Sequence, residues 1–264
     1  MIRRYRRISQ LIVFISIFII PLLNVFEITF VKGTFYSLDI GDIAIADPLS
    51  IFQAMISSKS FLMVMLVSTI VPIMLMILLG RVWCSWMCPY YLLTEFIESI
   101  AKKFRIKLKK PTYSKTRNTK TNATRFITLL IGITLTGIAG IPLLNLISAP
   151  GLMSSQALVL VKFHYITFEA AFIIFLLFME FFYYKFWCRY FCPQGTFLSL
   201  FRNKKGLRVE KVVENCSNCY SCIRTCPMCI NPMEDGLNYL CHNCGNCIDV
   251  CPDNKKTDTL KFRF

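Results

Sequence analysis

The chain has 264 residues, of which 55% are hydrophobic and only 17% are charged. Soluble domains are usually about one-quarter charged, so this composition excludes an ordinary soluble globular protein. The formal net charge of +15 would suit a nucleic-acid partner, but ten of the thirty Lys and Arg residues lie between Lys102 and Arg125, and this clustering argues against one.

Four long apolar segments predict four transmembrane helices, because spanning a bilayer takes about 20 apolar residues. They cover residues 8–26, 61–80, 126–150 and 163–184. A buried core helix is the alternative for any one of them, but four such lengths are unusual in a soluble protein. Four arginines precede the first segment, as in a signal peptide. It is too long for one and no A-x-A-like cleavage site follows it, so we expect it to be retained.

The loop after the first segment predicts a short helix at the membrane surface. Its lipid-facing side would consist of four apolar residues, namely Leu49, Ile51, Phe52 and Met55.

Basic residues predict how the helices are oriented in the membrane. They cluster before the first segment and between the second and third, whereas the loops after the first and third segments carry few. This positive-inside pattern places both termini and the central basic loop in the cytoplasm. The loop would serve as a topology signal and contact anionic lipid, and we expect no nucleic-acid partner.

An internal duplication divides the apolar region into two halves. The sequence Ile-Pro-Leu-Leu-Asn occurs at 20–24 and again at 141–145, and Trp-Cys-x-x-x-Cys-Pro occurs at 83–89 and again at 187–193. Each half is therefore predicted to be one membrane hairpin that ends in a cysteine pair. The predicted fold is an all-α four-helix transmembrane bundle over residues 1–205, followed by a small α+β ferredoxin-like domain over residues 206–264.

The cysteines of the repeated motif leave three interpretations open. Cys84, Cys88, Cys188 and Cys192 could jointly hold a further cluster or metal, form a redox-active thiol set, or be structural. Residues i and i+4 share a helix face, and the proline places each motif at a helix end. A thiolate there would need a positive partner, for which Arg81 and Arg189 are candidates.

Aromatic residues flank both motifs and suit a belt at the membrane interface. They are Trp83, Trp86, Tyr90, Trp187, Tyr190 and Phe191.

The C-terminal region contains two runs of the form C-x₂-C-x₂-C-x₃-C-P, the pattern of bacterial ferredoxins with two [4Fe–4S] clusters. In this pattern the fourth cysteine of each run ligates the other cluster. Cluster one is therefore assigned to Cys216, Cys219, Cys222 and Cys251, and cluster two to Cys241, Cys244, Cys247 and Cys226.

Other uses of the thirteen cysteines fit less well. A structural zinc site needs four ligands in paired spacing, and a cytoplasmic disulfide framework would be reduced. Cys229 is left over and is expected to be a small buried residue beside cluster two. The domain is too short for a large core, so we expect it to be unfolded without iron.

Ionisable residues inside a predicted membrane helix are functional candidates. Glu169 and Glu180 are eleven residues apart and lie on nearly the same helix face, with His164 near the outer end of that helix. Such groups would suit a relay for protons released by quinol oxidation.

The whole arrangement resembles the NapH family of membrane quinol dehydrogenase subunits, which is associated with periplasmic nitrate reduction. The resemblance rests on the four apolar segments, on the motifs at 80–89 and 186–193, and on the two ferredoxin runs. NosR-type proteins add an N-terminal flavin domain and FixG/CcoG-type proteins add a C-terminal domain, and neither addition is present in this sequence.

The resemblance implies a subunit in the bacterial inner membrane with two [4Fe–4S] clusters, and the positive-inside pattern places the ferredoxin domain on the cytoplasmic side. It would oxidise quinol from the quinol pool, and the expected quinol is menaquinol. Electrons would pass to a NapG-like iron–sulfur protein or another periplasmic acceptor, in nitrate or nitrous-oxide reduction. Two alternatives stay open: a copper reductase that uses the paired cysteines as its metal site, and a membrane anchor or assembly scaffold.

Overall fold

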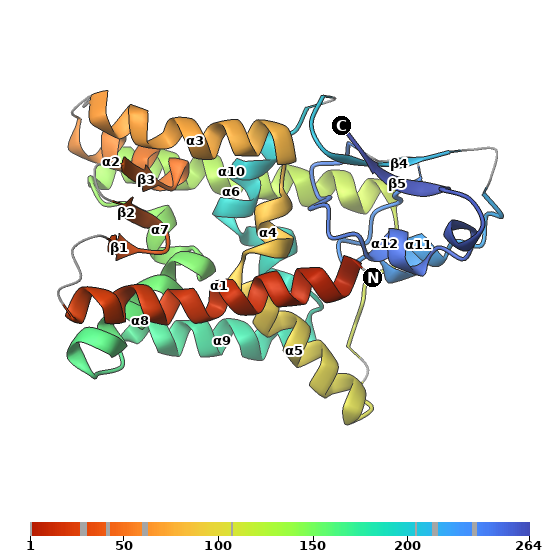
Figure 1. Cartoon of the computed structure of the whole chain (residues 1–264), viewed down its shortest axis with the longest axis horizontal. Coiled ribbons are helices and arrows are strands. Elements are labelled where there is room, and N and C mark those ends of the chain that lie inside the picture. The colour runs from red at the N-terminus through yellow and green to blue at the C-terminus, as the bar shows by residue number, and fades with distance from the viewer. Residues whose placement is uncertain are drawn as a thin grey trace.

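The computed structural model describes most of the chain, and within it the fold is mainly helical (Figure 1). Long helices run side by side through one part of the molecule, and the cysteine-rich C-terminal part packs against one end of them. The described residues are 2–26, 31–40, 43–59, 63–106, 108–203, 205–212, 216–233 and 237–264.

Two helices in the described part of the chain are long and apolar enough to cross a membrane. They are α1 (Ile2–Val25) and α6 (Lys115–Ala139), with 24 and 25 residues. The other two predicted spans appear as shorter apolar helices, α3 (Met63–Leu79) with 17 residues and α9 (Phe168–Phe182) with 15. A helix rises about 1.5 Å per residue, so α3 and α9 are about 22–26 Å long.

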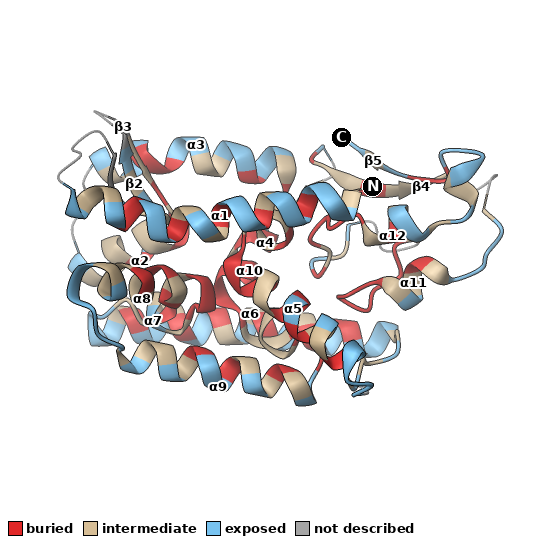
Figure 2. Ribbon diagram, turned by 60° about the horizontal axis from the view of Figure 1, so that its bottom comes forward, coloured by how far each residue is buried: buried red, intermediate tan, exposed pale blue. Residues whose placement is uncertain are grey.

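Many residues of these helices are exposed, as the pale-blue parts of α1, α3 and α9 in Figure 2 show, and many of the exposed residues are large and apolar. Only 22% of the apolar stretch of α1 and 17% of that of α6 are buried inside the protein. Val64 of α3 and Ile174 of α9 are also exposed. Soluble proteins rarely expose apolar surface of this extent, so the helices indicate association with a membrane rather than a buried core.

The prediction of one helix over 126–150 is wrong. Helix α6 ends at Ala139, because Gly140 adopts the left-handed conformation (φ 65°) that commonly terminates helices. The chain then turns through the short helix α7 (Leu143–Ile147) and enters α8 (Ala149–Phe163), whose first turn contains Pro150. The sequence shows the apolar residues of this segment but not the reversal.

The predicted loop after the first span contains more structure than expected, and the all-α description of this part is wrong. Three short strands form an antiparallel sheet: β1 (Val31–Thr34), β2 (Ser37–Ile40) and β3 (Ile43–Ala46). Helix α2 (Pro48–Ser58) follows, capped by the Asp47 carboxylate, which accepts from the backbone N–H of Ser50 at 3.0 Å.

The surface helix predicted in this loop therefore exists, but its apolar residues do not share one environment. Phe52 is exposed, and Ile51 and Met55 are partly buried. Leu49 is fully buried against Leu129 and Leu144, so it packs in the protein interior and cannot face lipid.

Each Cys-Pro pair begins a helix rather than ending one. Helix α4 (Val82–Trp86) leads into α5 (Pro89–Lys103), and the π-helix η1 (Trp187–Phe191) leads into α10 (Pro193–Leu200). Proline is favoured in the first helical turn because its missing N–H has no partner to lose there.

The C-terminal region combines two strands with short helices around its cysteines. Strand β4 (Arg208–Lys211) pairs antiparallel with β5 (Leu260–Arg263), so that Arg208 is opposite Arg263. Helices α11 (Ser221–Thr225) and α12 (Asn246–Val250) each contain the third cysteine of a run, and η3 (Asp253–Lys255) follows the last cysteine. Buried Val209, Cys222, Cys247 and Leu260 form its small core.

Gly132 lets α6 approach α7 closely, which generates a test of the packing. An added Cβ at Gly132 would lie 2.1 Å from Cδ2 of the fully buried Leu144. We expect Gly132→Ala to destabilise the protein by about 1–3 kcal/mol through overpacking, measured as a lower midpoint of thermal unfolding in detergent. Gly137→Ala is the matched control, because its Cβ would meet Ile56 at an ordinary 3.5 Å. Equal midpoints for the two variants would contradict this packing.

Candidate functional site

The two Cys-x-x-x-Cys-Pro motifs share a widened backbone turn. The N–H of Cys88 donates to the carbonyl of Trp83 at 3.1 Å, and the N–H of Cys192 donates to that of Trp187 at 2.9 Å. Each bond spans five residues, as in a π-helix, a geometry frequent at functional sites. The second cysteine of each motif then caps the helix that its proline begins.

The four motif cysteines line one cavity inside the helical domain. Cys84, Cys88, Cys188 and Cys192 face it, together with Arg81, Tyr91, Met228 and His242. Gly195 leaves space between two of the sulfurs, because an added Cβ there would lie 3.7 Å from Cys84 Sγ and 3.6 Å from Cys192 Sγ. The N–H of Gly195 donates to Cys192 Sγ at 3.4 Å. Residues from both repeats thus build one site.

Four cysteine thiols that line one cavity provide the number of ligands that an iron–sulfur cluster takes. Among the residues that the structure describes, no three His, Cys, Asp or Glu side chains lie close enough to hold one ion. The described cysteines of the two C-terminal runs also form no group that could hold a single metal ion, although their sequence pattern is that of 4Fe–4S ligands. Four thiols around a cavity, with a backbone N–H directed at one sulfur, suit an iron–sulfur cluster, whose potential depends on such hydrogen bonds.

Burial affects the protonation of these thiols. It raises the pKa of Cys192 to about 11, despite the opposing effect of the Arg81 and Arg125 guanidinium groups, and it also raises the pKa of Cys88. Thiols of this kind are poor nucleophiles unless a metal displaces the proton. The environment therefore disfavours a free redox-active thiolate set, and it fits either protonated structural thiols or thiolates bound to a metal.

Only one of the two cations expected beside these sulfurs lies there. The Arg81 guanidinium reaches the space above Gly195, between the sulfurs. Arg189 points elsewhere, because its guanidinium donates to the Met228 carbonyl at 2.8 Å and to Asn118 Oδ1 at 2.9 Å.

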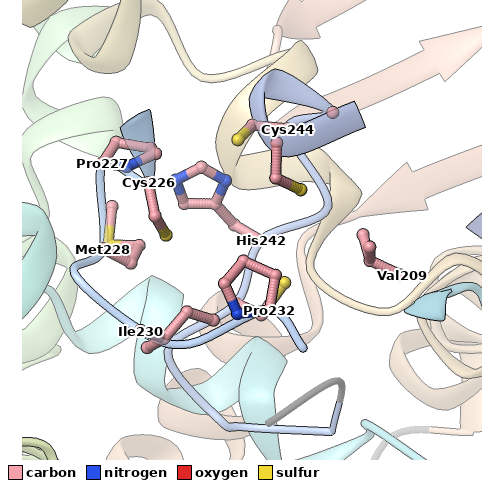
Figure 3. A pocket seen from close by; sticks show the side chains of 11 residues that line it. Val209, Cys226, Pro227, Met228, Ile230, Pro232, His242 and Cys244 are labelled. Carbon is pink, nitrogen blue, oxygen red and sulfur yellow. The ribbon is translucent and has the colours of Figure 1, made fainter. Parts of the chain in front are cut away.

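A second cavity, in the C-terminal region, is lined by the four cysteines assigned to cluster two. Figure 3 shows Cys226 and Cys244 directed into it, with Met228, Ile230, Pro232 and Val209 around them. Cys241 and Cys247 complete the set. The structure thus brings the fourth cysteine of the first run to the first three cysteines of the second.

The cysteines assigned to cluster one lie at the outer side of the same region. Cys222 is buried with Cys247, and Cys251 packs against them. Cys216 is partly buried and Cys219 is exposed. Cys222 is thus the inner member of this set, and Cys219 faces solvent.

His242 and Met228 line both the four-cysteine cavity and the cluster-two cavity. His242 is 2% exposed, and neither of its ring nitrogens has a hydrogen-bond partner. Its ring meets the edge of the Tyr91 ring at a centroid distance of 5.1 Å. The two sulfur-lined cavities are therefore neighbours separated by single side chains, with an unpaired imidazole between them.

Three buried arginines and the partly buried Arg202 of the helical domain hold the cysteine-rich loops through backbone carbonyls. Arg6 donates to Cys244 at 3.2 Å, Arg81 to Tyr239 at 2.5 Å and Arg202 to Cys241 at 2.6 Å. Arg189 holds Met228 in the same way. Burying a guanidinium without partners is costly, so each contact stabilises the docked arrangement.

Neutral groups add to this docking. The indole N–H of Trp86 donates to the Asn243 carbonyl at 3.2 Å, and the Asn118 amide donates to Cys229 at 3.2 Å. At the amino end of α1, the backbone N–H groups of Ile2 and Arg3 donate to the Asp249 carboxylate of α12 at 3.0 and 2.7 Å. Carboxylates are favoured at helix N-termini, so the start of α1 is bound by the C-terminal region.

Sequence reasoning missed this docking because it treated the basic residues as a topology signal. Arg125, from the basic segment, is buried and lies 3.4 Å from the Tyr239 carbonyl. Lys110 donates to the Arg224 carbonyl at 2.5 Å. The sequence feature that could have indicated this docking is an arginine among apolar residues, such as Arg81 between Gly80 and Val82.

The three ionisable candidates of the fourth predicted span lie apart. Glu180 is buried beside the second motif, where it accepts from Tyr90 Oη and from the backbone N–H of Phe186, both at 3.1 Å. Glu169 lies at the other end of α9 and accepts from Ser155 Oγ at 3.1 Å. His164 is exposed at the end of α8.

Two further sequence expectations concern single residues. Tyr90 is 1% exposed, so its assignment to an interface belt is wrong: the phenol faces inward, toward Glu180. Cys229 is buried beside Met228 and Arg189 contacts its thiol, as expected for a packed residue.

Comparison with known proteins agrees with this geometry. The family described as "4Fe-4S binding domain" matches residues 61–110 and 165–210, which contain both Cys-x-x-x-Cys-Pro motifs. The family described as "4Fe-4S dicluster domain" matches residues 198–262. The chain is therefore a ferredoxin-type protein that binds 4Fe–4S clusters.

Individual relatives narrow this class. An uncharacterized protein of Methanocaldococcus jannaschii is 32% identical over 165 residues, covering 62% of this chain and 66% of the relative. The methylamine utilization ferredoxin-type protein MauN of Methylorubrum extorquens is 26% identical, covering 88% and 77%. The ferredoxin-type protein NapH of Escherichia coli is 25% identical, covering 70% and 61%. The chain is thus related at low identity to the ferredoxin-type proteins NapH and MauN and to NosR.

The chain spans less than two thirds of the length of two uncharacterized proteins of Methanocaldococcus jannaschii, 66% of the one described above and 60% of a second. No solved structure matches the chain.

The docking contacts generate a prediction for Arg189→Leu. Loss of the guanidinium leaves the buried Met228 carbonyl and Asn118 amide oxygen without this donor, which costs about 2–3 kcal/mol. We expect a lower midpoint of thermal unfolding and faster proteolytic cleavage between α10 and β4. Arg117→Leu, at an exposed position of α6, is the control and should behave as the wild type. Unchanged cleavage of the Arg189 variant would show that this contact does not hold the region in place.

Proposed function

We propose that this chain is a membrane electron-transfer subunit that oxidises quinol and passes the electrons through iron–sulfur clusters to a partner protein. The observation that carries the proposal is the pair of adjoining sulfur-lined cavities, which share Met228 and His242 as walls. One cavity lies among the apolar helices and the other in the ferredoxin-like region. The printed relation to NapH supports the same function.

Four membrane spans, α1, α3, α6 and α9, are part of this proposal. Their outward apolar residues and the basic residues near one end support it, and the ferredoxin-like region would then lie on the cytoplasmic side. The short helices α3 and α9 are compatible with a locally thinned bilayer or with flanking residues that extend to the interface.

Three clusters are proposed. Two take the ligand sets of the C-terminal runs, and the third takes Cys84, Cys88, Cys188 and Cys192. When bound, such clusters supply one-electron redox chemistry. The chain itself supplies the buried thiol ligands, the Gly195 N–H directed at one sulfur and the Arg81 charge between two of them.

The quinol pool and a NapG-like iron–sulfur protein, or another periplasmic acceptor, are the proposed partners. Quinol oxidation releases protons, and Glu180 is the one of the three earlier candidates that lies beside a cysteine motif. A copper reductase and an assembly scaffold are the competing functions. Burial of Cys88 and Cys192 favours a resident cluster over an open copper site.

Iron content tests the third cluster. The wild-type protein, purified without oxygen, should contain about 12 iron atoms per chain if three [4Fe–4S] clusters are present. The double variant Cys88→Ser, Cys192→Ser should contain about 8 and keep the electron paramagnetic resonance signals of the ferredoxin pair. Cys229→Ser, which changes a buried cysteine outside all three sets, is the control. A wild type with about 8 iron atoms would contradict the third cluster.

Quinol oxidation is tested by adding a menaquinol analogue to the anaerobic holoprotein and following cluster absorption. Bleaching of the absorption by quinol, inhibited by a quinol-site inhibitor, is the expected result. Clusters that dithionite reduces but quinol does not would overturn the proposal. Oxidation of reduced clusters by Cu(II), lost in Cys84→Ser with Cys188→Ser, would favour the copper reductase.

A further inference from the structure

A third cavity, of about 450 Å³, lies where α5 meets the ferredoxin-like region. Tyr91, Glu95 and Glu98 of α5 form one side of it. Tyr184, Pro227 and Asn246 are among the residues that close it from the other elements. The cavity is larger than either sulfur-lined one and is bordered by both polar and apolar surface.

Two buried polar atoms from residues that line this cavity have no hydrogen-bond partner. They are Tyr91 Oη and Glu95 Oε2, on residues that are 1% and 6% exposed. The other carboxylate oxygen of Glu95 pairs with Arg6. Buried polar groups in proteins nearly always have partners, and an unmet one is costly. The two residues are one helical turn apart on α5, so a ligand that carries hydroxyl groups could satisfy both.

The cavity adjoins both sulfur-lined cavities. Tyr91 lines the four-cysteine cavity as well, and its ring contacts His242. Pro227 lines the cluster-two cavity as well and follows the cluster-two ligand Cys226 directly. A molecule in the third cavity is therefore separated from each proposed cluster site by a single side chain.

Positive charge surrounds Tyr91. The Lys185 ammonium lies 4.2 Å from the centroid of the Tyr91 ring and donates to Thr94 Oγ1 at 2.7 Å. The Arg6 guanidinium lies 5.6 Å from the same centroid. These buried cations would stabilise negative charge that develops on an aromatic hydroxyl oxygen as it loses its proton.

We propose that this cavity binds the head group of a quinol, with one hydroxyl hydrogen-bonded to Glu95 Oε2 and Tyr91 Oη. This inference rests on the proposed function and assigns its substrate site. The two O–H bonds of the quinol break, their protons pass to the carboxylates that face the cavity, Glu95 and Glu98, and the product is the quinone. The cysteines of the adjoining cavities would hold the two clusters, and these would supply the one-electron acceptors for the two electrons.

An anionic lipid head group is the other chemistry to weigh, because Arg3, Lys102, Lys110 and Arg224 also line the cavity. Three carboxylates face it too, those of Glu95, Glu98 and Asp249. An unpaired carboxylate oxygen accepts a hydrogen bond from a hydroxyl but repels a phosphate. The lining therefore favours a neutral molecule that donates hydrogen bonds.

The test is equilibrium binding of a fluorescent quinol analogue, 2-heptyl-4-hydroxyquinoline N-oxide, to the purified holoprotein, followed by quenching of its fluorescence. Tyr91→Phe removes only the hydroxyl, and loss of one hydrogen bond should weaken binding about three- to tenfold. Glu95→Gln should weaken it at least as much. Tyr165→Phe, at an exposed position on the connection between α8 and α9, is the matched control and should bind as the wild type does. Iron content should be unchanged in Tyr91→Phe.

The outcomes separate this inference from the proposed function. Wild-type binding and quinol-dependent cluster reduction that persist unchanged in both variants would mean that quinol binds elsewhere, which overturns the site and leaves the function. Absence of both in the wild type would overturn the function and the site with it. Displacement of the analogue by cardiolipin vesicles, but not by neutral vesicles, would identify an anionic-lipid site instead. Glu95→Gln also removes the negative charge that pairs with Arg6. If Glu95→Gln fails to fold, the binding measured for Tyr91→Phe decides the test.

Discussion

The burial of arginine guanidinium groups against backbone carbonyls is the interaction on which the arrangement of this protein depends. Arg6, Arg81, Arg189 and Arg202 each donate to a carbonyl of a cysteine-rich loop. Loops of this kind contain little regular structure that could pack against helices, so their carbonyls are the available acceptors. The contacts fix the cluster-two cavity beside the four-cysteine cavity, and the shared positions of Met228 and His242 follow from that.

Local patterns in the sequence predicted the parts of the fold that depend on local spacing. The cysteine runs are confirmed as a 4Fe–4S dicluster region, and the first apolar segment as a long helix. The repeated Ile-Pro-Leu-Leu-Asn shows the limit of this approach: Pro21 lies inside α1, whereas Pro142 precedes α7. Gly140, just before the second copy, reverses the chain there, and nothing before the first copy does so.

The candidate site was less predictable, because its geometry depends on contacts between distant residues. The motifs identified the four cysteines but not that they face one cavity. Arg81 was correctly placed near the sulfurs and Arg189 was not, although each lies close to a motif cysteine in the sequence. Tyr91 and Glu95 carry no motif, and their unmet hydrogen bonds are visible only once α5 is packed against the C-terminal region.

The contact between the start of α1 and Asp249 has a consequence for biosynthesis. Ile2 and Asp249 are 247 positions apart, so the amino end of α1 gains its acceptor only once α12, far along the chain, has been synthesised. Arg6 of the same helix likewise donates to the Cys244 carbonyl, which is synthesised much later than α1. The contact with Asp249 therefore forms only after α12 has been synthesised, and a chain truncated before α12 would leave the amino end of α1 without its carboxylate acceptor.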